Sequence, residues 1–199
     1  PMFGLFGVSL TGIQPIGGGK HLRLNFRKGS TNLSGLLFGT TAEDFPYLVG
    51  DTLDLAVRLE RNEYMGQIKV SIYIREIRMS RTDDELYLKS KRLYEKIRRR
   101  DRLTKKEAEF ALPSRQEIAD LFRFIRDSGG WKHDTDILCY RLGGDGRNAC
   151  RVLIGTDVLC ELGIFRREGE SILPANLQIE VNLEDSRLMQ YLKKAGKES

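Results

Sequence analysis

Hydrophobic and polar residues alternate with a period of two along several stretches of the first 79 residues. The pattern is clearest over residues 20–27 and 67–79 and is typical of half-buried β-strands. The predicted inward set is Leu22, Leu24, Phe26, Ile68, Val70, Ile72 and Ile74. The predicted outward set carries cations, an amide and an aromatic ring, which suits a nucleic-acid backbone and its bases. Its members are His21, Arg23, Asn25, Arg27, Lys69, Ser71, Tyr73 and Arg75.

Turn residues divide this first part into five predicted strands, over residues 5–16, 20–27, 32–38, 52–61 and 67–79. Between the third and fourth strands, Ala42, Phe45 and Leu48 keep helical spacing, which predicts a short helix over residues 41–48. Five strands with a helix after the third is the order of an OB barrel, a fold that binds oligomers on strands 2 and 3 and on loops 1-2 and 4-5. We therefore expect residues 1–79 to form an OB-type β-barrel.

Beyond residue 79 the pattern becomes helical. Residues 80–112 mix leucines with a cluster of cations and predict a basic helical connector, with a break near residues 101–104. A capping-box pattern at Ser114 and Glu117 begins the next helix. Two more helices, a hairpin near residues 168–170 and a strand over 178–183 follow, so residues 113–199 resemble a winged-helix module. The expected fold class is α+β, with three parts at 1–79, 80–112 and 113–199.

Composition and charge point to a soluble protein with an anionic partner. The chain has 199 residues, 40% of them apolar, a net charge of +5 and a pI near 9.2. Residues 1–79 hold 9 Lys/Arg against 7 Asp/Glu, residues 80–112 hold 11 against 7, and residues 113–199 hold 13 against 14. Electrostatic attraction to DNA or RNA should therefore come from the first two parts.

Cysteine usage and the lack of a membrane segment indicate the compartment. Cys139, Cys150 and Cys160 are odd in number and follow no disulfide framework, which favours a reducing environment. We find no apolar run near the roughly 20 residues that span a bilayer, and no basic-then-apolar leader. We predict a cytoplasmic protein without a membrane partner. Residues 1–8 already pattern as structure, so we expect the chain to be a piece of a longer protein.

Catalytic and metal-binding motifs are not recognisable in the sequence. The run GGGKH at residues 17–21 lacks the spacing of a nucleotide-binding loop and precedes a strand instead of a helix. His21 and His133 lie in different predicted domains and have no metal-ligand spacing around them, whereas a two-metal hydrolase clusters its Asp and His ligands. His133 with Asp134 and Asp136 is more simply a helix start rich in acids. We predict no catalytic residue, no metal site and no cofactor in this chain.

The candidate nucleic-acid contacts each have a simpler alternative. The ladder on residues 20–28 could be a solvated sheet face, although the OB-like strand order favours binding, with its cations on phosphates. Tyr64, in the predicted loop 4-5, could stack on a base for roughly 1–3 kcal/mol, or belong to an ordinary hairpin tip. The predicted binding residues are Lys20, His21, Arg23, Asn25, Arg27, Lys28, Arg58, Arg61, Asn62, Tyr64, Lys69, Tyr73 and Arg75.

Two further basic segments leave alternatives open. The cluster over residues 98–106 could be an arm that follows phosphates or simply the solvated face of a helix. The third helix of the last part would offer Arg147, Asn148 and Arg151 to DNA, but that part is slightly acidic. Contact with protein is therefore the favoured interpretation for residues 113–199.

Residues 1–79 resemble the C-terminal OB domain of the RecJ family, bacterial single-strand-specific 5′-to-3′ DNA exonucleases, in the runs GGGKHLRLNF, LSGLLFG, GDTLDLAVRLERNEYMG and IKVSIYIREIR. Residues 113–199, with LPSRQEIADLFRFIR and ACRVLIGTDVLCELGIF, are similar to the extra C-terminal domain that some bacterial members carry. In that family the catalytic domains lie upstream: an Asp-His-His phosphoesterase domain holding Mn²⁺ or Mg²⁺, then a domain with a Gly-Gly-Gly-His type motif. GGGKH differs from the second motif because Lys20 interrupts it.

The resemblance implies a non-catalytic part that binds single-stranded DNA and guides it to an upstream metal-dependent phosphoesterase in recombination and repair. By itself this chain should not cut DNA. The alternative is a protein-interaction module that docks a single-strand-binding protein or another repair factor, whose acidic tail would meet the exposed cations.

Overall fold

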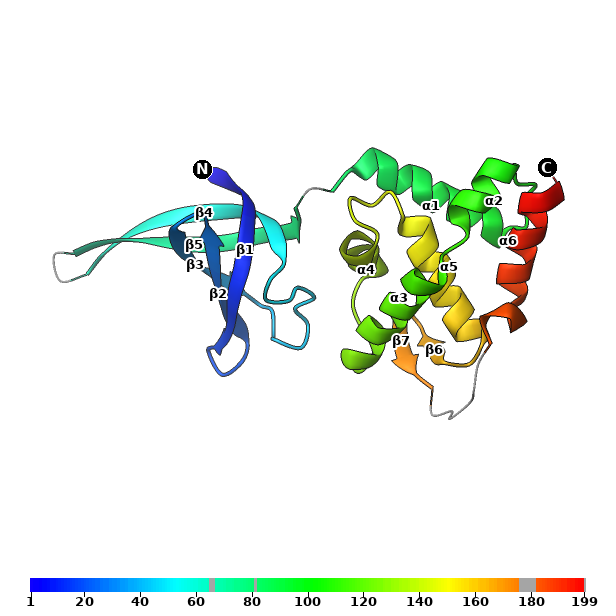
Figure 1. The fold of residues 1–199 in the computed structure, drawn as a ribbon. Coiled ribbons are helices and arrows are strands. Elements are labelled where there is room, and N and C mark those ends of the chain that lie inside the picture. The colour runs from blue at the N-terminus through cyan, green and yellow to red at the C-terminus, as the bar shows by residue number, and fades with distance from the viewer. Residues whose placement is uncertain (65–66, 81, 176–181, 199) are drawn as a thin grey trace. The chain divides into compact units, whose positions relative to one another are not determined.

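The computed structural model describes residues 1–64, 67–80, 82–175 and 182–198, and describes only the backbone of residues 62–64, 67–69 and 198. The chain splits into two compact units, Pro1–Arg81 and Thr82–Ser199 (Figure 1). The first is built of strands and the second mainly of helices, as expected for the α+β class. No helix among the described residues combines the length and apolar character needed to cross a bilayer.

Residues 1–64 and 67–80 form a closed barrel with strand order β1-β2-β3-β5-β4, which confirms the predicted OB-type architecture. Neighbouring strands are antiparallel except β3 and β5, which are parallel. The strands are β1 (Met2–Ile16), β2 (His21–Lys28), β3 (Thr31–Phe38), β4 (Thr52–Tyr64) and β5 (Gln67–Met79).

Strand β1 belongs to both sides of the barrel. Its first half pairs with β4 and its second half with β2, and the register shifts between Leu5 and Val8 and again between Leu10 and Gly12. Such bulges bend a strand strongly, which lets one strand close a small barrel. The barrel core contains the predicted inward residues of β2 together with apolar residues of β1, β4 and β5: Val8, Leu10, Leu22, Leu24, Phe26, Leu53, Leu55, Val57 and Ile74.

The β3–β5 seam consists, in the described chain, of two paired positions: Gly35 faces Ile72, and Leu36 faces Tyr73. A side-chain carbon on Gly35 would lie 2.9 Å from Cδ1 of Ile74. Glycine at this position therefore lets β5 approach β3 closely enough to close the barrel.

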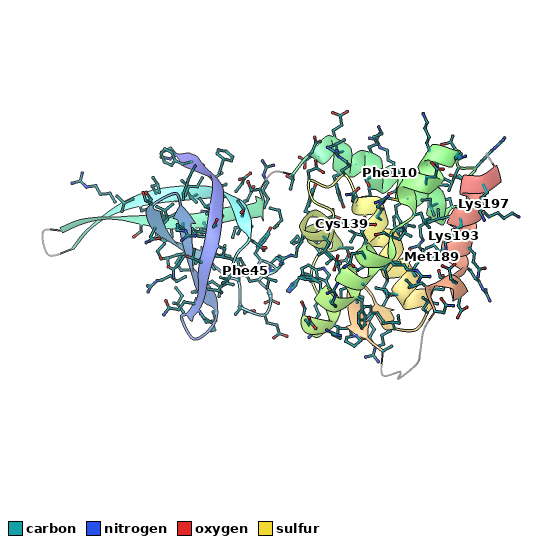
Figure 2. All side chains as sticks on the ribbon, in the orientation of Figure 1. Phe45, Phe110, Cys139, Met189, Lys193 and Lys197 are labelled. Atoms are coloured by element: carbon teal, nitrogen blue, oxygen red, sulfur yellow. The ribbon has the colours of Figure 1, made fainter. Side chains whose placement is uncertain are left out.

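The helix predicted over residues 41–48 is wrong. The segment forms turns, because Pro46 has no backbone N–H and disfavours a helical conformation at Phe45. Phe45 (Figure 2) and Tyr47 are nevertheless buried, and the Tyr47 hydroxyl donates a hydrogen bond to the carbonyl oxygen of Ile77 at 2.8 Å. Of the three residues with helical spacing only Phe45 is buried, since Ala42 and Leu48 are exposed.

The prediction that Val70 faces the core is also wrong, since 60% of it is exposed. The β4–β5 hairpin continues past the rest of the barrel as a two-stranded ribbon (Figure 1). Val70 is exposed because it pairs with Arg61 beyond the contact with β3, where the described chain has no third strand beside the ribbon, and Leu59 lies at the end of that contact.

Residues 82–175 and 182–198 form the second unit. Both predicted capping boxes are present, at Thr104 with Glu107 and at Ser114 with Glu117. Of the strand predicted over 178–183, residues 178–181 lie outside the described part and Leu183 lies in a 3₁₀ turn. The elements are α1 (Asp84–Arg98), α2 (Lys105–Ala111), α3 (Arg115–Asp127), α4 (Thr135–Leu142), α5 (Ala149–Glu161), β6 (Phe165–Glu168), β7 (Ser171–Pro174), the 3₁₀ turn η1 (Leu183–Asp185) and α6 (Arg187–Glu198).

Helix α5 is the centre of this unit. Nine of its thirteen residues are buried, and α1, α3 and α4 pack against it. Residues 80–112 were expected to be a connector, but α1 and α2 contribute Tyr87, Ile97, Ala108 and Ala111 to the same core. The apolar positions of α1 and α2 are therefore structural, and these helices are part of the second unit instead of a bridge to it.

Glu161, at the end of α5, holds the start of α6. Its carboxylate accepts hydrogen bonds from the Ser186 hydroxyl at 2.7 Å, from the Arg187 N–H at 3.0 Å and from the Leu188 N–H at 3.3 Å. Burial raises the pKa of Glu161, but these hydrogen bonds outweigh it and leave the pKa below its usual range. The negative charge also faces the positive end of the α6 dipole.

We expect Gly35→Val to destabilise the barrel by about 1–3 kcal/mol, because the added carbons meet Ile74 across the seam. Calorimetric unfolding of the full chain would measure this. The fluorescence of Trp131, the single tryptophan and part of the second unit, should report an unchanged transition there. The neighbouring exposed Ser34→Val is the matched control. Equal stability of the two variants would contradict the role given to Gly35.

We expect Glu161→Gln to lower the free energy of unfolding of the second unit by about 1 kcal/mol at pH 7, as loss of a helix cap does. The carboxylate's contribution is complete above its unfolded-state pKa of about 4.3 and is lost as pH falls through the lower folded-state pKa. Urea titrations followed by Trp131 fluorescence should therefore show the difference from wild type shrinking below about pH 4. Glu170→Gln, in the exposed β6–β7 turn, should change little; a pH-independent deficit for Glu161→Gln would refute the carboxylate's role.

Candidate nucleic-acid interface

The cation ladder lies on the outer face of β2, as its alternation predicted. Arg23, Asn25 and Arg27 are exposed, while the residues between them are buried. Together with Lys28 they extend along a strand, and residues 21–27 span roughly 20 Å at about 3.3 Å per residue. Among the described side chains, no carboxylate forms an ion pair with the cations of this segment, which are Lys20, Arg23, Arg27 and Lys28.

Loop 1-2 is a tight glycine turn beside this face. Gly17, Gly18 and Gly19 have φ of 59°, 67° and 85°, a left-handed conformation that side chains rarely adopt. A side-chain carbon on Gly17 would lie 3.0 Å from Cδ2 of His21, so the turn packs against the histidine ring. The exposed Lys20 follows directly. The predicted location at the edge of the binding face is consistent with this geometry.

His21 joins the turn to the end of β3. Its Nδ1 accepts a hydrogen bond from the Gly39 N–H at 3.0 Å. An accepting Nδ1 leaves the hydrogen of the neutral ring on Nε2, which is then a donor. The ring also meets Phe38, its cross-strand partner, edge to face with centroids 4.8 Å apart.

Phe38 completes an aromatic row, which we define as His21, Phe38 and Tyr73. The rings of Phe38 and Tyr73 stack with centroids 5.8 Å apart and an interplanar angle of 19°. The row crosses β2, β3 and β5, and Arg58 on β4 is the cross-strand partner of Tyr73. Phe38 is 51% exposed, so its ring is accessible from outside.

Sequence analysis missed Phe38 because the run LSGLLFG has no clear alternation. A usable signal existed in the hairpin register. The short turn at Gly29 and Ser30 pairs Lys28 with Thr31, and counting outward from it places Phe38 opposite His21.

The remaining predicted residues lie on β4 and β5. Arg58 pairs with Glu60 at 3.3 Å, Arg61 is exposed, and Arg75 is exposed at a bulge where the β4–β5 register shifts. The side chains of Asn62, Tyr64 and Lys69 lie outside the described residues. Side-chain contacts thus join His21 and Tyr73 through Phe38, while strand register places Arg23 and Arg58 beside them.

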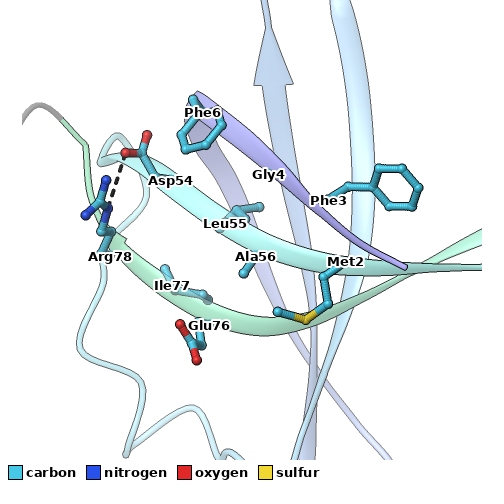
Figure 3. A pocket seen from close by; sticks show the side chains of 10 residues that line it. All are labelled: Met2, Phe3, Gly4, Phe6, Asp54, Leu55, Ala56, Glu76, Ile77 and Arg78. Atoms are coloured by element: carbon cyan, nitrogen blue, oxygen red, sulfur yellow. Dashed lines mark ion pairs between the residues drawn. The ribbon is translucent and has the colours of Figure 1, made fainter.

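Elsewhere on the barrel lies a hollow, which we call the barrel hollow (Figure 3). It measures about 390 Å³ and has the exposed side chains of Met2, Phe3 and Phe6 at its border. Its acidic and basic groups include an ion pair between Asp54 and Arg78 at 3.5 Å. Such a surface has no excess of cations to attract phosphates. The outer face of β2 and β3 that carries the cation ladder and Phe38, which we call the β2–β3 face, is the better candidate.

The described residues hold no group of three or more His, Cys, Asp or Glu side chains arranged for a metal ion. Asp134 caps α4, and Asp136 pairs with Lys91 at 3.0 Å, which supports the interpretation of this segment as a helix start. Burial raises the pKa of the Cys150 thiol to about 12, so it remains protonated at neutral pH.

The cations of the third helix in the predicted winged-helix module are engaged inside the unit. Arg151 donates to the carbonyl oxygen of Phe110 at 2.7 Å and pairs with Glu117 at 2.9 Å. Arg147 pairs with Asp145 at 3.3 Å. Because α5 itself is largely buried, it offers no open face to a DNA groove.

Comparison with known proteins bears on the first unit. Residues 1–76 match the family described as the RecJ OB domain. No curated protein matches the chain.

Two solved structures are similar to parts of it. RecJ in complex with Mg²⁺ from Thermus thermophilus is 22% identical with a TM-score of 0.28, covering 39% of this chain. Aspartyl-tRNA synthetase from Entamoeba histolytica is 11% identical with a TM-score of 0.31, covering 81%. The chain spans 11% of the length of the first and 33% of the second. The family match covers nearly the whole first unit, whose closed five-stranded barrel is therefore similar to a RecJ OB domain.

Proposed function

We propose that this chain is the non-catalytic C-terminal part of a RecJ-like single-strand-specific exonuclease. Its barrel would bind single-stranded DNA on the β2–β3 face and guide it to a metal-dependent phosphoesterase domain elsewhere in the longer protein. The observation that carries the proposal is the set of β2 cations that have no acidic partner among the described side chains, beside the aromatic row, in a domain that matches RecJ OB domains.

The chemistry of that face suits a single strand of any sequence. Arg23 and Arg27 would contact phosphates and release condensed counterions, so affinity should fall as salt rises. Aromatic rings stack on every base, which adds affinity without sequence preference. Neither process needs a metal in this chain; Mn²⁺ or Mg²⁺ would belong to the catalytic domain. Roles in repair and recombination and a cytoplasmic location remain part of the proposal.

A second candidate function, docking of a single-strand-binding protein, is favoured by a groove on the second unit. The groove measures about 670 Å³ and is lined by Leu86, Leu93 and Phe110. Its border carries cations, of which Lys96 pairs with Glu107 at 2.8 Å. Within the described residues no acidic group pairs with the others on α1 and α2, namely Lys89, Arg92 and Lys106.

Three arginines at the end of α1 and just after it are less available. Arg98 and Arg99 pair with acidic residues, and the Arg100 guanidinium lies over the Tyr191 ring at 4.6 Å. An acidic tail with apolar side chains would therefore fit the groove better than the segment that follows α1. The winged-helix interpretation of residues 113–199 stays a prediction and is compatible with either function.

We expect the double variant Arg23→Ala, Arg27→Ala to bind labelled oligo-dT roughly tenfold more weakly at low salt. Its slope of log affinity against log salt should fall in magnitude by roughly 1.4, since two phosphate contacts are lost. Arg78→Ala is the matched control, because Arg78 is paired with Asp54 at the barrel hollow. If wild type fails to bind oligo-dT at low salt, or if double variant and control bind alike, the proposal is wrong.

For the second candidate, we expect Lys89→Glu with Arg92→Glu to abolish capture of a single-strand-binding protein by the full chain, because the groove border becomes acidic. Binding of oligo-dT to the barrel should be unchanged. Arg123→Glu is the control, since Arg123 lies outside the groove and is paired with Asp120 on α3. Capture that survives the double variant would reject the groove as the docking site.

A further inference from the structure

We infer that Phe38 is the base-stacking residue of the barrel and makes the β2–β3 face selective for strands with unpaired bases. The inference rests on the proposed function, and deepens it by naming the part of the DNA that this face recognises. It depends on the position, support and surroundings of one ring.

The Phe38 ring is accessible and yet fixed. Half of the side chain is exposed, although Tyr73 stacks on the ring and His21 meets it edge to face. A side chain held in one orientation before binding loses little conformational entropy when a ligand arrives. A base placed on Phe38 would extend an existing stack instead of having to build one.

The support reaches the backbone on both sides of the ring. On one side, the hydrogen bond from the Gly39 N–H to His21 Nδ1 holds the end of β3 against β2. On the other, Tyr73 lies on β5 next to the β3–β5 seam. The ring is thus positioned by three strands, as a precise binding element requires.

Phosphate-binding groups lie at a suitable place beside the row. Arg23 is two residues along β2 from His21, on the same exposed face, and Arg58 faces Tyr73 from β4. A strand whose base stacks on Phe38 would therefore have Arg23 near its backbone on one side and, on the other, Arg58, which Glu60 also contacts at 3.3 Å. Stacking and charge together are the usual basis of sequence-independent single-strand binding.

Two other exposed aromatic residues that the structure describes in the barrel, Phe3 and Phe6, lack this setting. Both border the barrel hollow, which is also lined by Asp54 and Glu76. Carboxylates at that position would repel phosphates. Exposure of an aromatic ring is common on protein surfaces, so the setting, not the exposure, distinguishes Phe38.

The test compares two oligonucleotides of equal length and charge, oligo-dT and the same strand carrying abasic sites, with the full chain at fixed salt. Wild type should bind oligo-dT roughly 5- to 150-fold more tightly, the range expected for one stacked base. Phe38→Ala should lose that difference while keeping its affinity for the abasic strand, which the cations bind. Phe38→Tyr should retain the preference, and Phe6→Ala, the matched control, should behave as wild type.

The outcomes separate this inference from the proposed function. If Phe38→Ala weakens both strands equally, or leaves the preference intact, Phe38 does not stack on a base and the single-strand function stands. If wild type binds neither strand, both fail. Should Phe38→Ala prove unstable in thermal unfolding, Phe38→Leu keeps an apolar contact without an aromatic face and must show the same loss of preference.

Discussion

Closure of the barrel between β3 and β5 is the constraint on which the rest of the first unit depends. Four of the five strand junctions are antiparallel and extend over many residues, whereas the seam rests on the pairing around Gly35 and Leu36 in the described chain. Parallel pairing of this kind brings Tyr73 beside Phe38 although 35 residues separate them in sequence. The aromatic row is therefore a product of tertiary closure and not of any single strand.

The two units use their charged residues in different ways. On β2 the cations stand without acidic partners among the described side chains and face solvent. In the second unit several cations are used to hold helices together, for example Arg151 between α2 and α3 and Lys91 between α1 and α4. Net charge alone would have pointed to residues 80–112 as the strongest nucleic-acid contact. In that segment Lys96, Arg98 and Arg99 are paired with acidic groups, whereas Lys89, Arg92 and Lys106 at the α1–α2 groove have no acidic partner within the described residues.

Local patterns predicted local structure well. Alternation located the strands and the inward face of β2, and the capping boxes at Thr104 and Ser114 located two helix starts, because these signals depend on neighbouring residues. Three features depend on contacts between segments that are distant in sequence, which local patterns do not contain. Alternation cannot tell where a barrel ends and a free ribbon begins, hence the error at Val70. The apolar spacing around Pro46 predicted a helix that does not form, and of its three residues only Phe45 is buried. Phe38 could be placed only by counting the β2–β3 register.

Because the aromatic row crosses the seam, occupancy of the face and integrity of the barrel are thermodynamically linked. A ligand that touches Phe38 on β3 and Tyr73 on β5 binds only when those strands are together. By mass action, such a ligand stabilises the closed form in proportion to the logarithm of its concentration over its dissociation constant. Bound DNA would then stabilise the seam, which is the least extensively paired junction of the described barrel. Local opening and amide exchange along β3 and β5 would become slower.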